Sequence, residues 1–192
     1  MLRNPVVIVP PSIGWAARFC SLGAVVRNAL GSRAFAIHHI GSTSVPHLCS
    51  KDVIDIQLTV ADVHDAPTIS ALADAGFILR DQPTHDHVPP GYTDTPDQWE
   101  KRYLREPPGM HAAHIHVRPA GKANQRYALL FRDYLRGHAG AAEAYARVKL
   151  LLAPKVERED YIEIKDPVCD LIMQAAEMWA ASTGWVLPSS DA

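Results

Sequence analysis

The stretch HHIGSTSVPHLCSKDVIDIQLTV, residues His38 to Val60, decides the fold that we expect for this chain. It contains two apolar strands separated by a turn rich in glycine, serine and threonine. In the second strand, alternation sends the even-numbered apolar residues from Ile54 to Val60 into the interior. The same alternation leaves Asp55, Gln57 and Thr59 together on the other face. The stretch therefore predicts a polar strand face beside a Gly-Ser turn.

The turn before that strand suits phosphate and metal chemistry. Gly41 lets the backbone approach a ligand closely, because it has no Cβ atom. Ser42 and Thr43 supply hydroxyls and amides for anionic oxygens. Asp55 supplies a hard oxygen ligand for a divalent cation, although a lone strand aspartate is more commonly a solvated carboxylate. We expect a phosphate and metal site between the turn and the strand.

This stretch resembles the signature of the GrpB family, approximately HIGSTSVPGLxxKPxIDI. The family is a branch of the DNA polymerase β-like nucleotidyltransferase superfamily. The superfamily pattern is a Gly-Ser turn, an Asp-x-Asp pair about a dozen residues later, and a third carboxylate on a later strand. Gly41, Ser42 and Asp55 stand in the matching places, and Gln57 stands where the second carboxylate is expected.

Further segments carry the resemblance through most of the chain. HIHVRPAGKANQRYALLFRDYLRGH, residues His114 to His138, is similar to the family's HVHVV…RRxLxFRDYLRxHP. YIEIKDPVCDLI, from Tyr161, is similar to its closing YxxxKxPFI. The chain departs from the family at His47, which replaces a glycine, and at Asp52, which replaces a proline. Some relatives are fused to a coenzyme A biosynthesis kinase, which points to cofactor metabolism.

The resemblance implies an α+β fold, with a nucleotidyltransferase-like mixed sheet flanked by helices and a helical C-terminal part. The expected strands cover residues 34–40, 54–60, 77–80, 99–106 and 111–119, the last two as an antiparallel pair. A helix is expected from near Ser12 to Gly31, and another over 66–75 with Asp65 as its N-cap. Residues 81–97, rich in proline, glycine, aspartate and threonine, predict a long irregular loop.

Helical spacing of apolar residues continues to the C-terminal part of the chain. Stripes end before Gly137 and before Pro154, and a third runs from Tyr161 to Trp179. Within it, Asp166-Pro167 predicts a kink or a fresh helix start, because aspartate caps well and proline suits the first helical position. We expect a single domain over residues 1–184 and a flexible tail over 185–192.

Composition limits the function classes. With 192 residues and 47% hydrophobic content, the chain is long enough for one well-buried domain. A formal charge of −2 and a pI near 6.5 argue against a strongly electrostatic nucleic-acid binder. The three cysteines are widely spaced and suggest neither a disulfide framework nor a zinc ribbon. With no signal peptide or membrane-spanning run expected, the cytoplasm is the predicted location.

The expected metal ligands follow from the resemblance. Asp55 is the charged ligand, and Gln57 and His116 are substitutes at the second and third carboxylate positions. The amide of Gln57 carries no charge, and the imidazole of His116 suits zinc or manganese better than magnesium. We therefore expect Mg²⁺ or Mn²⁺, with Zn²⁺ as the alternative. His114 and His116 share one strand face, and both are also interpretable as ordinary surface histidines.

Three cations are expected to contact phosphate. Lys101 and Arg105 share a face at strand spacing, where they suit a polyphosphate. Lys165 precedes Asp166-Pro167, where an ammonium beside helix amides favours an anion. Solvated charges are the common alternative for all three.

Three functions remain open from the sequence. The leading hypothesis is a metal-dependent nucleotidyltransferase that takes a nucleoside triphosphate and transfers a nucleotidyl group to an unidentified acceptor. The first rival is a catalytically weakened nucleotide-binding module, since carboxylates are missing. The second is a transition-metal hydrolase whose site is built from Asp55, His85, His87 and His116.

Overall fold

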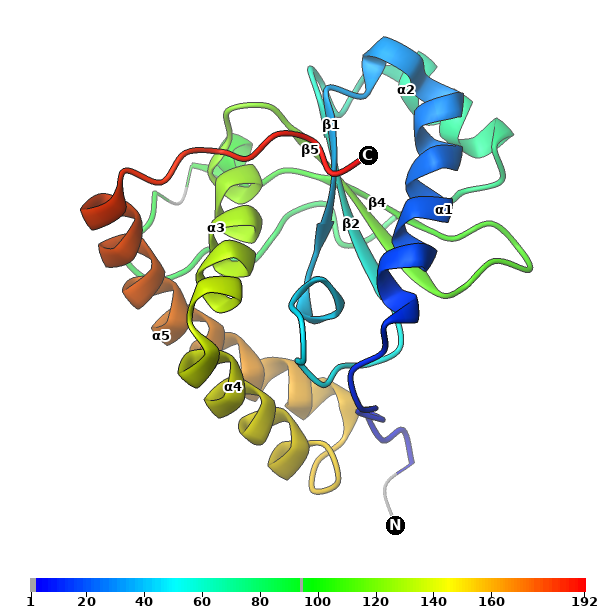
Figure 1. Ribbon diagram of the computed structural model, residues 1–192. Helices are drawn as coiled ribbons and strands as arrows, with labels where there is room; N and C mark the ends of the chain where they lie inside the picture. Colours follow the sequence, from blue (N-terminus) through cyan, green and yellow to red (C-terminus); the bar gives the residue numbers. More distant parts are fainter. Residues whose placement is uncertain (1–2, 94) are drawn as a thin grey trace.

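The computed structural model describes residues 3–93 and 95–192. Its centre is a five-stranded sheet in the order β1-β2-β5-β4-β3 (Figure 1). The strands are β1 (Ala36–Ile40), β2 (Ile54–Val60), β3 (Ile78–Arg80), β4 (Arg102–Arg105) and β5 (Ala113–Pro119). β2 and β5 run parallel, whereas the other neighbouring pairs are antiparallel. The mixed sheet of the predicted α+β fold is confirmed, including the antiparallel β4–β5 pair.

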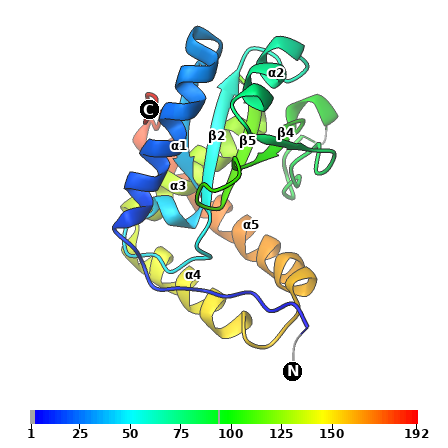
Figure 2. The same ribbon diagram turned by 90° about the vertical axis from the view of Figure 1, so that its right-hand side faces the viewer.

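Helices cover both faces of this sheet. They are α1 (Gly14–Leu30), α2 (Ala66–Asp74), α3 (Ala123–Gly137), α4 (Ala139–Leu152) and α5 (Arg158–Thr183). α1 and α2 pack on one face, and α3 packs on the other against β1 and β5 (Figure 2). α4 and α5 contact α3 and extend beyond the end of the sheet that carries the Gly41 turn (Figure 1). Among the described residues, none of the helices has the length and apolar character needed to cross a bilayer.

β2 shows the predicted alternation, and both of its faces are buried. Ile54, Ile56 and Leu58 are fully buried in the core beneath α1 and α2. Each such side chain contributes about 1.5–3 kcal/mol relative to an exposed one. Gln57 is equally inaccessible on the opposite face, and its side chain donates to the backbone of Gln125 in α3. The polar face of β2 is therefore covered by α3.

The predicted starts and ends of the first two helices are confirmed. α1 ends at Leu30, and Gly31 follows with φ of 54°. Asp65 caps α2, because its carboxylate accepts from the backbone N–H of Thr68 at 3.0 Å. The irregular loop predicted over residues 81–97 holds no strand in its described part; Asp94 of that prediction lies outside the described residues.

α5 corrects one prediction. It runs without interruption from Arg158 to Thr183 and contains Pro167, so Asp166 does not cap a fresh helix. Proline removes one helical hydrogen bond, but buried residues on both sides of it hold the helix. Tyr161 packs on the N-terminal segment near Val6, and Met173 packs against α3. Tertiary packing therefore overrides the local preference of the Asp-Pro pair.

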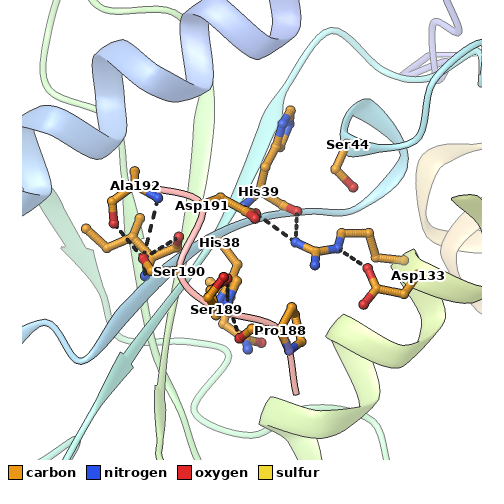
Figure 3. A network of polar contacts seen from close by, with 12 residues as sticks. His38, His39, Ser44, Asp133, Pro188, Ser189, Ser190, Asp191 and Ala192 are labelled. Atoms are coloured by element: carbon orange, nitrogen blue, oxygen red, sulfur yellow. Dashed lines mark hydrogen bonds and ion pairs between the residues drawn. The ribbon is translucent and has the colours of Figure 1, made fainter. Parts of the chain in front are cut away.

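The C-terminal segment lies along the free edge of β1 (Figure 3). The backbone N–H of Asp191 donates to the Ile37 carbonyl at 2.9 Å. The Asp191 carboxylate accepts from the N–H of His39 at 2.9 Å and from Arg132 at 2.7 Å. The sequence predicts a flexible tail over 185–192, whereas these contacts attach its last residues to the sheet. The physical reason is that Arg132, on α3, is buried and requires carboxylate partners.

Candidate functional site

The Gly41 turn brings backbone against a carboxylate. β1 ends at Ile40, and Gly41 follows with φ of 68° and ψ of −174°. Residues other than glycine rarely adopt this backbone conformation. A Cβ atom on Gly41 would lie 2.4 Å from Oδ2 of Asp55. Glycine is therefore required here for two reasons, the backbone conformation and the close approach of Asp55. The spacing that the sequence suggested for Gly41 and Asp55 places them in direct contact.

Asp55 meets two histidines from the neighbouring strand. β2 and β5 are paired so that Asp55 lies beside His114, and Gln57 beside His116. Nδ1 of His114 lies 3.0 Å from Oδ1 of Asp55, and Nε2 of His116 lies 3.8 Å from the same oxygen. Tyr103 of β4 packs over both imidazoles, with ring centroids 5.4 and 5.5 Å away. These contacts fix three side chains around one point.

The charges of this trio are set by burial and by one another. Burial alone would raise the pKa of Asp55, but the hydrogen bond from His114 and the nearby imidazole of His116 hold it far below its usual range. Burial lowers the pKa of His116 to about 4, despite the opposing effect of Asp55. At neutral pH, Asp55 is therefore an anion and His116 is neutral. These are the protonation states in which both side chains bind metal ions.

The donors of the trio fit a divalent transition metal. Each residue offers one ligand atom, and the three atoms lie within 4.8 Å of one another. Two imidazole nitrogens and one carboxylate oxygen suit zinc, manganese or iron, whereas magnesium prefers oxygen ligands. Asp55, His114 and His116 are thus the residues that would hold the ion.

Gln57 lies outside this trio. Its Oε1 accepts from Nη1 of Arg118 at 2.6 Å, and its Nε2 donates to the Gln125 carbonyl at 3.1 Å. Both ends of the amide are therefore occupied by protein groups. The structure brings Asp55 and His116 together as the sequence suggested. Gln57, which was expected to join them as a metal ligand, instead points toward Arg118 and α3.

Lys101 belongs to a second buried charge cluster. Its Nζ lies 2.5 Å from Oδ1 of Asp86, and Arg118 binds the same carboxylate at 2.8 and 3.0 Å. Nδ2 of Asn124 adds a third donor at 3.2 Å. Asp86 lies in the long loop after β3, so this cluster attaches that loop to the sheet and to α3. Lys101 is satisfied within the protein.

Arg105 points elsewhere. Its guanidinium contacts the neighbouring Glu106 at 3.0 Å and the Ala113 carbonyl at 3.1 Å. Neither Arg105 nor Lys101 lines the pocket into which Asp55, His114 and His116 open. The two cations predicted to share a phosphate are therefore engaged with different carboxylates.

The trio opens into a pocket of about 320 Å³ between the sheet and α3, α4 and α5. Gly41 and Ser42 line it, and so do three lysines from separate segments: Lys51, Lys149 and Lys165. Burial lowers the pKa of Lys51, and it lowers that of Lys149 to about 8. The charge of Lys165 contributes to both decreases. Crowded, partly desolvated ammonium groups favour an anion with several oxygens.

The two hydroxyls of the turn have different surroundings. Oγ of Ser42 accepts from Nζ of Lys149 at 2.9 Å and lines the pocket. Thr43 is buried, with Oγ1 at 2.9 Å from Nε2 of His39. His39 in turn stacks on Phe19 of α1, with ring centroids 4.8 Å apart. Ser42 therefore belongs to the pocket, and Thr43 supports the turn from behind.

Lys165 reaches the pocket by a different route from the one predicted. It lies within α5 and not beside a helix N-terminus, so no free helix amides accompany it. Its Nζ contacts Oδ1 of Asp166 at 3.1 Å. The expectation of a combined lysine and helix-end anion site is therefore wrong, while the side chain itself does line the pocket.

The other histidine pair does not join the metal ligands. His85 forms an isolated bridge with Glu100. His87 lines the pocket but contacts Asp170 of α5 at 3.0 Å. Within the described residues, the cluster that can hold a metal consists of Asp55, His114 and His116.

Comparisons with known proteins agree with the motifs. The family model described as GrpB protein matches residues 5–175. The chain belongs to the GrpB family. The crystal structure of conserved protein GrpB from Enterococcus faecalis matches it with a TM-score of 0.70 and 24% identity, covering 90% of this chain and 99% of that one. The GrpB fold is therefore shared over nearly the whole chain.

Curated relatives of this GrpB-family chain include longer proteins. A dephospho-CoA kinase from Mycolicibacterium paratuberculosis is 31% identical over 198 residues, which cover 95% of this chain and 49% of the kinase. UPF0157 protein BH1888 from Halalkalibacterium halodurans is 33% identical over 165 residues, or 84% of this chain and 77% of that protein. The chain thus spans about half the length of the dephospho-CoA kinases it matches.

Several pocket residues of this GrpB-family chain were not singled out by sequence. The sequence places His114 on the same face as His116 without predicting it as a metal ligand, although the HxH spacing is itself the signal. Lys51 stands at the family's KPxIDI lysine, four residues before Asp55. Lys149 and Asp86 carry no local signal, because the fold brings them to the site from a helix and a loop far away in sequence.

Proposed function

We propose that this protein binds a nucleoside triphosphate with a divalent metal ion and transfers a nucleotidyl group to an acceptor. The observation that carries the proposal is the pocket in which the Asp55, His114 and His116 trio and three lysines meet the Gly41 turn. Membership of the GrpB family supports it through the resemblance to nucleotidyltransferases. The volume of about 320 Å³ is within the range of small-molecule sites.

The cationic side chains of the pocket and its metal-binding side chains have different roles in this proposal. Lys51, Lys149 and Lys165 supply the positive charge that binds the triphosphate oxygens. Gly41 lines the pocket and lets Asp55 lie against the turn, because a Cβ atom at Gly41 would collide with the Asp55 carboxylate. Asp55 and the two histidines would hold the ion, which would supply charge neutralisation at the phosphates. The acceptor oxygen attacks the α-phosphorus, the bond from that phosphorus to the β-phosphate bridging oxygen breaks, and pyrophosphate leaves.

The test measures binding and turnover on the same protein. Calorimetry with each nucleoside triphosphate, in Mn²⁺ and then in Mg²⁺, is expected to show binding that Lys149→Met weakens at least tenfold. Lys155→Met is the matched control, because Lys155 is exposed and lies outside the pocket. A pyrophosphate assay with candidate acceptors then measures transfer. Equal nucleotide affinity for Lys149→Met and wild type would remove the triphosphate role of the pocket.

A second function is favoured by the two nitrogen ligands of the trio. A transition-metal hydrolase would use Asp55, His114 and His116 to hold the ion, with water as the attacking group. This candidate predicts hydrolysis that needs Zn²⁺ or Mn²⁺ and no acceptor. Nucleotide binding without turnover under either condition would instead indicate the weakened binding module.

A further inference from the structure

One end of the pocket is lined by aromatic side chains. Tyr127 and Phe131 of α3 lie nearly parallel, with ring centroids 6.3 Å apart and an angle of 13°. Trp99 meets Tyr127 edge-on at 6.2 Å. All three side chains line the pocket. Flat apolar walls of this kind suit a planar ring, because aromatic faces stack on nucleobases at about 1–3 kcal/mol per base.

Asn124 lines the same end, and its amide has a fixed orientation. The side chain is 1% exposed. Nδ2 donates to the Asp86 carboxylate at 3.2 Å and to the Glu100 carbonyl at 2.9 Å. Both partners only accept, so the amide nitrogen faces them and the oxygen faces the other way. Within the described chain, Oδ1 of Asn124 is buried without a hydrogen-bond partner.

The polar groups around Asn124 have mostly used their donors. Nε1 of Trp99 donates to the Thr93 carbonyl at 2.7 Å. The Arg118 guanidinium donates to Asp86 and to Gln57. A buried acceptor that lacks a donor costs free energy until a partner supplies one. Oδ1 of Asn124 therefore requires a hydrogen-bond donor from a bound molecule.

We infer that this end holds the nucleobase and that Asn124 selects a base with an exocyclic amino group. The inference rests on the proposed function, because it names the part of the triphosphate that the aromatic walls receive. An amino group donates to Oδ1 of Asn124, whereas a carbonyl at the same ring position places two acceptors against each other. Adenine and cytosine have such an amino group, and hypoxanthine and uracil have the carbonyl.

Matched nucleotides test the inference on the unaltered protein. Calorimetry in Mn²⁺ compares ATP with ITP and CTP with UTP, since each pair differs by an amino group or a carbonyl. At least one pair is expected to favour the amino form about tenfold, the size of one satisfied hydrogen bond. Equal affinity within both pairs, or a preference for the carbonyl forms, would overturn the role of Asn124.

Binding of inorganic tripolyphosphate, which has no base, tests the proposed phosphate site separately from the inferred base site. Binding of tripolyphosphate as tightly as of all four nucleotides would leave the phosphate site intact and overturn the base site. Failure of tripolyphosphate and every nucleotide to bind would overturn the proposed function together with the inference. The expected result is that tripolyphosphate binds and that an amino-bearing nucleotide binds at least tenfold more tightly.

Two variants locate the selectivity. Asn124→Leu is expected to abolish the difference within the favoured pair, and Tyr127→Leu is expected to weaken all nucleotides without affecting tripolyphosphate. Tyr127→Phe keeps the ring and is the matched control for stacking. Circular dichroism establishes that each variant is folded before its affinity is compared. Selectivity that survives unchanged in folded Asn124→Leu would contradict the assignment.

Discussion

Two partly buried aspartates line the same pocket and have opposite surroundings. Asp55 contacts two imidazoles, those of His114 and His116. Asp86 contacts the ammonium group of Lys101 and the guanidinium group of Arg118. The first carboxylate therefore keeps the capacity to bind a cation from solution, and the second is already neutralised by the protein.

The pKa values of the two carboxyl groups show the same contrast. Burial would raise both, and both are nevertheless far below the usual range. For Asp86, the causes are chiefly the charge and hydrogen bonds of Arg118, followed by Lys101. For Asp55, they are the hydrogen bond of the His114 imidazole and the proximity of His116. A similar pKa thus results from a closed ion cluster in one case and from a candidate metal site in the other.

The largest expected effect comes from removing the closed cluster. Asp86→Ala leaves the buried Lys101 and Arg118 without their carboxylate, and breaking a buried pair in this way costs about 3–5 kcal/mol. Asp55→Asn leaves no buried cation, so its cost in metal-free buffer is expected to be less than about 2 kcal/mol. Urea denaturation of both variants measures the difference. Losses of equal size would contradict the contrast between the two sites.

The pH dependence of stability follows from the histidines. Burial lowers the pKa of His116 and of His39 to about 4. Between pH 6.5 and 4 the unfolded chain therefore binds protons that the folded chain does not, and stability falls as the pH falls. His116 contributes on the order of 2–3 kcal/mol to this loss. The Asp86 contribution is present above the ordinary carboxyl pKa and is lost only at lower pH.

Urea midpoints measured from pH 7.5 to 3.5 test that assignment. His116→Gln is expected to reduce the slope between pH 6.5 and 4 without abolishing it, because burial also lowers the pKa of His39 and of His38. A slope that is unchanged in the variant would show that His116 is not the source.

A smaller effect is expected at the glycine that contacts Asp55. Gly41→Ala places a methyl group where Oδ2 of Asp55 lies and strains the backbone, which costs about 1–3 kcal/mol. The displaced carboxylate is expected to bind Mn²⁺ at least tenfold more weakly. Gly140→Ala in α4 is the matched control, because nothing lies within 4 Å of its added Cβ. Unchanged Mn²⁺ affinity in Gly41→Ala would show that the contact with Asp55 is not needed.

The smallest effect is expected at Arg105. Its contact with Glu106 is partly exposed, so Arg105→Ala is expected to change stability by less than about 1 kcal/mol. Nucleotide affinity is expected to stay within twofold of wild type, because Arg105 does not line the pocket. A tenfold loss of triphosphate binding would restore the role that the sequence suggested for this residue.

Local sequence patterns predicted the strands and helix ends because burial of alternate residues and helix capping depend on neighbouring residues. Alternation in β2 identified its buried face, and Asp65 was identified as a cap by its position before an apolar stripe. The mixed sheet followed from the resemblance to the GrpB family. Of the two outcomes predicted for Asp166-Pro167, the fresh helix start is wrong, because packing of α5 around Tyr161 and Met173 outweighs a single unfavourable helix residue.

The site was predictable only where its residues are close in sequence or on neighbouring strands. Gly41 and Asp55 are in contact as their motif suggested. The HxH spacing of His114 and His116 places both imidazoles on one strand face, next to Asp55. The sequence predicts that Lys101 binds phosphate because it does not reveal the ion pair of Lys101 with Asp86. Asp86 lies in an irregular loop, and no periodicity predicts the course of that loop. The sequence predicts a flexible tail because it does not show that buried Arg132 forms an ion pair with Asp191. That contact depends on the tertiary structure.

Metal titration of the Asp55 site tests the central claim most directly. Calorimetry with Mn²⁺ and with Zn²⁺ compares wild type, Asp55→Asn and His114→Ala, with His85→Ala as a control outside the trio. One ion per wild-type chain is expected, with affinity reduced at least tenfold in Asp55→Asn and His114→Ala and unchanged in His85→Ala. Affinity that is the same in wild type and Asp55→Asn would contradict the assignment of the trio as a metal site.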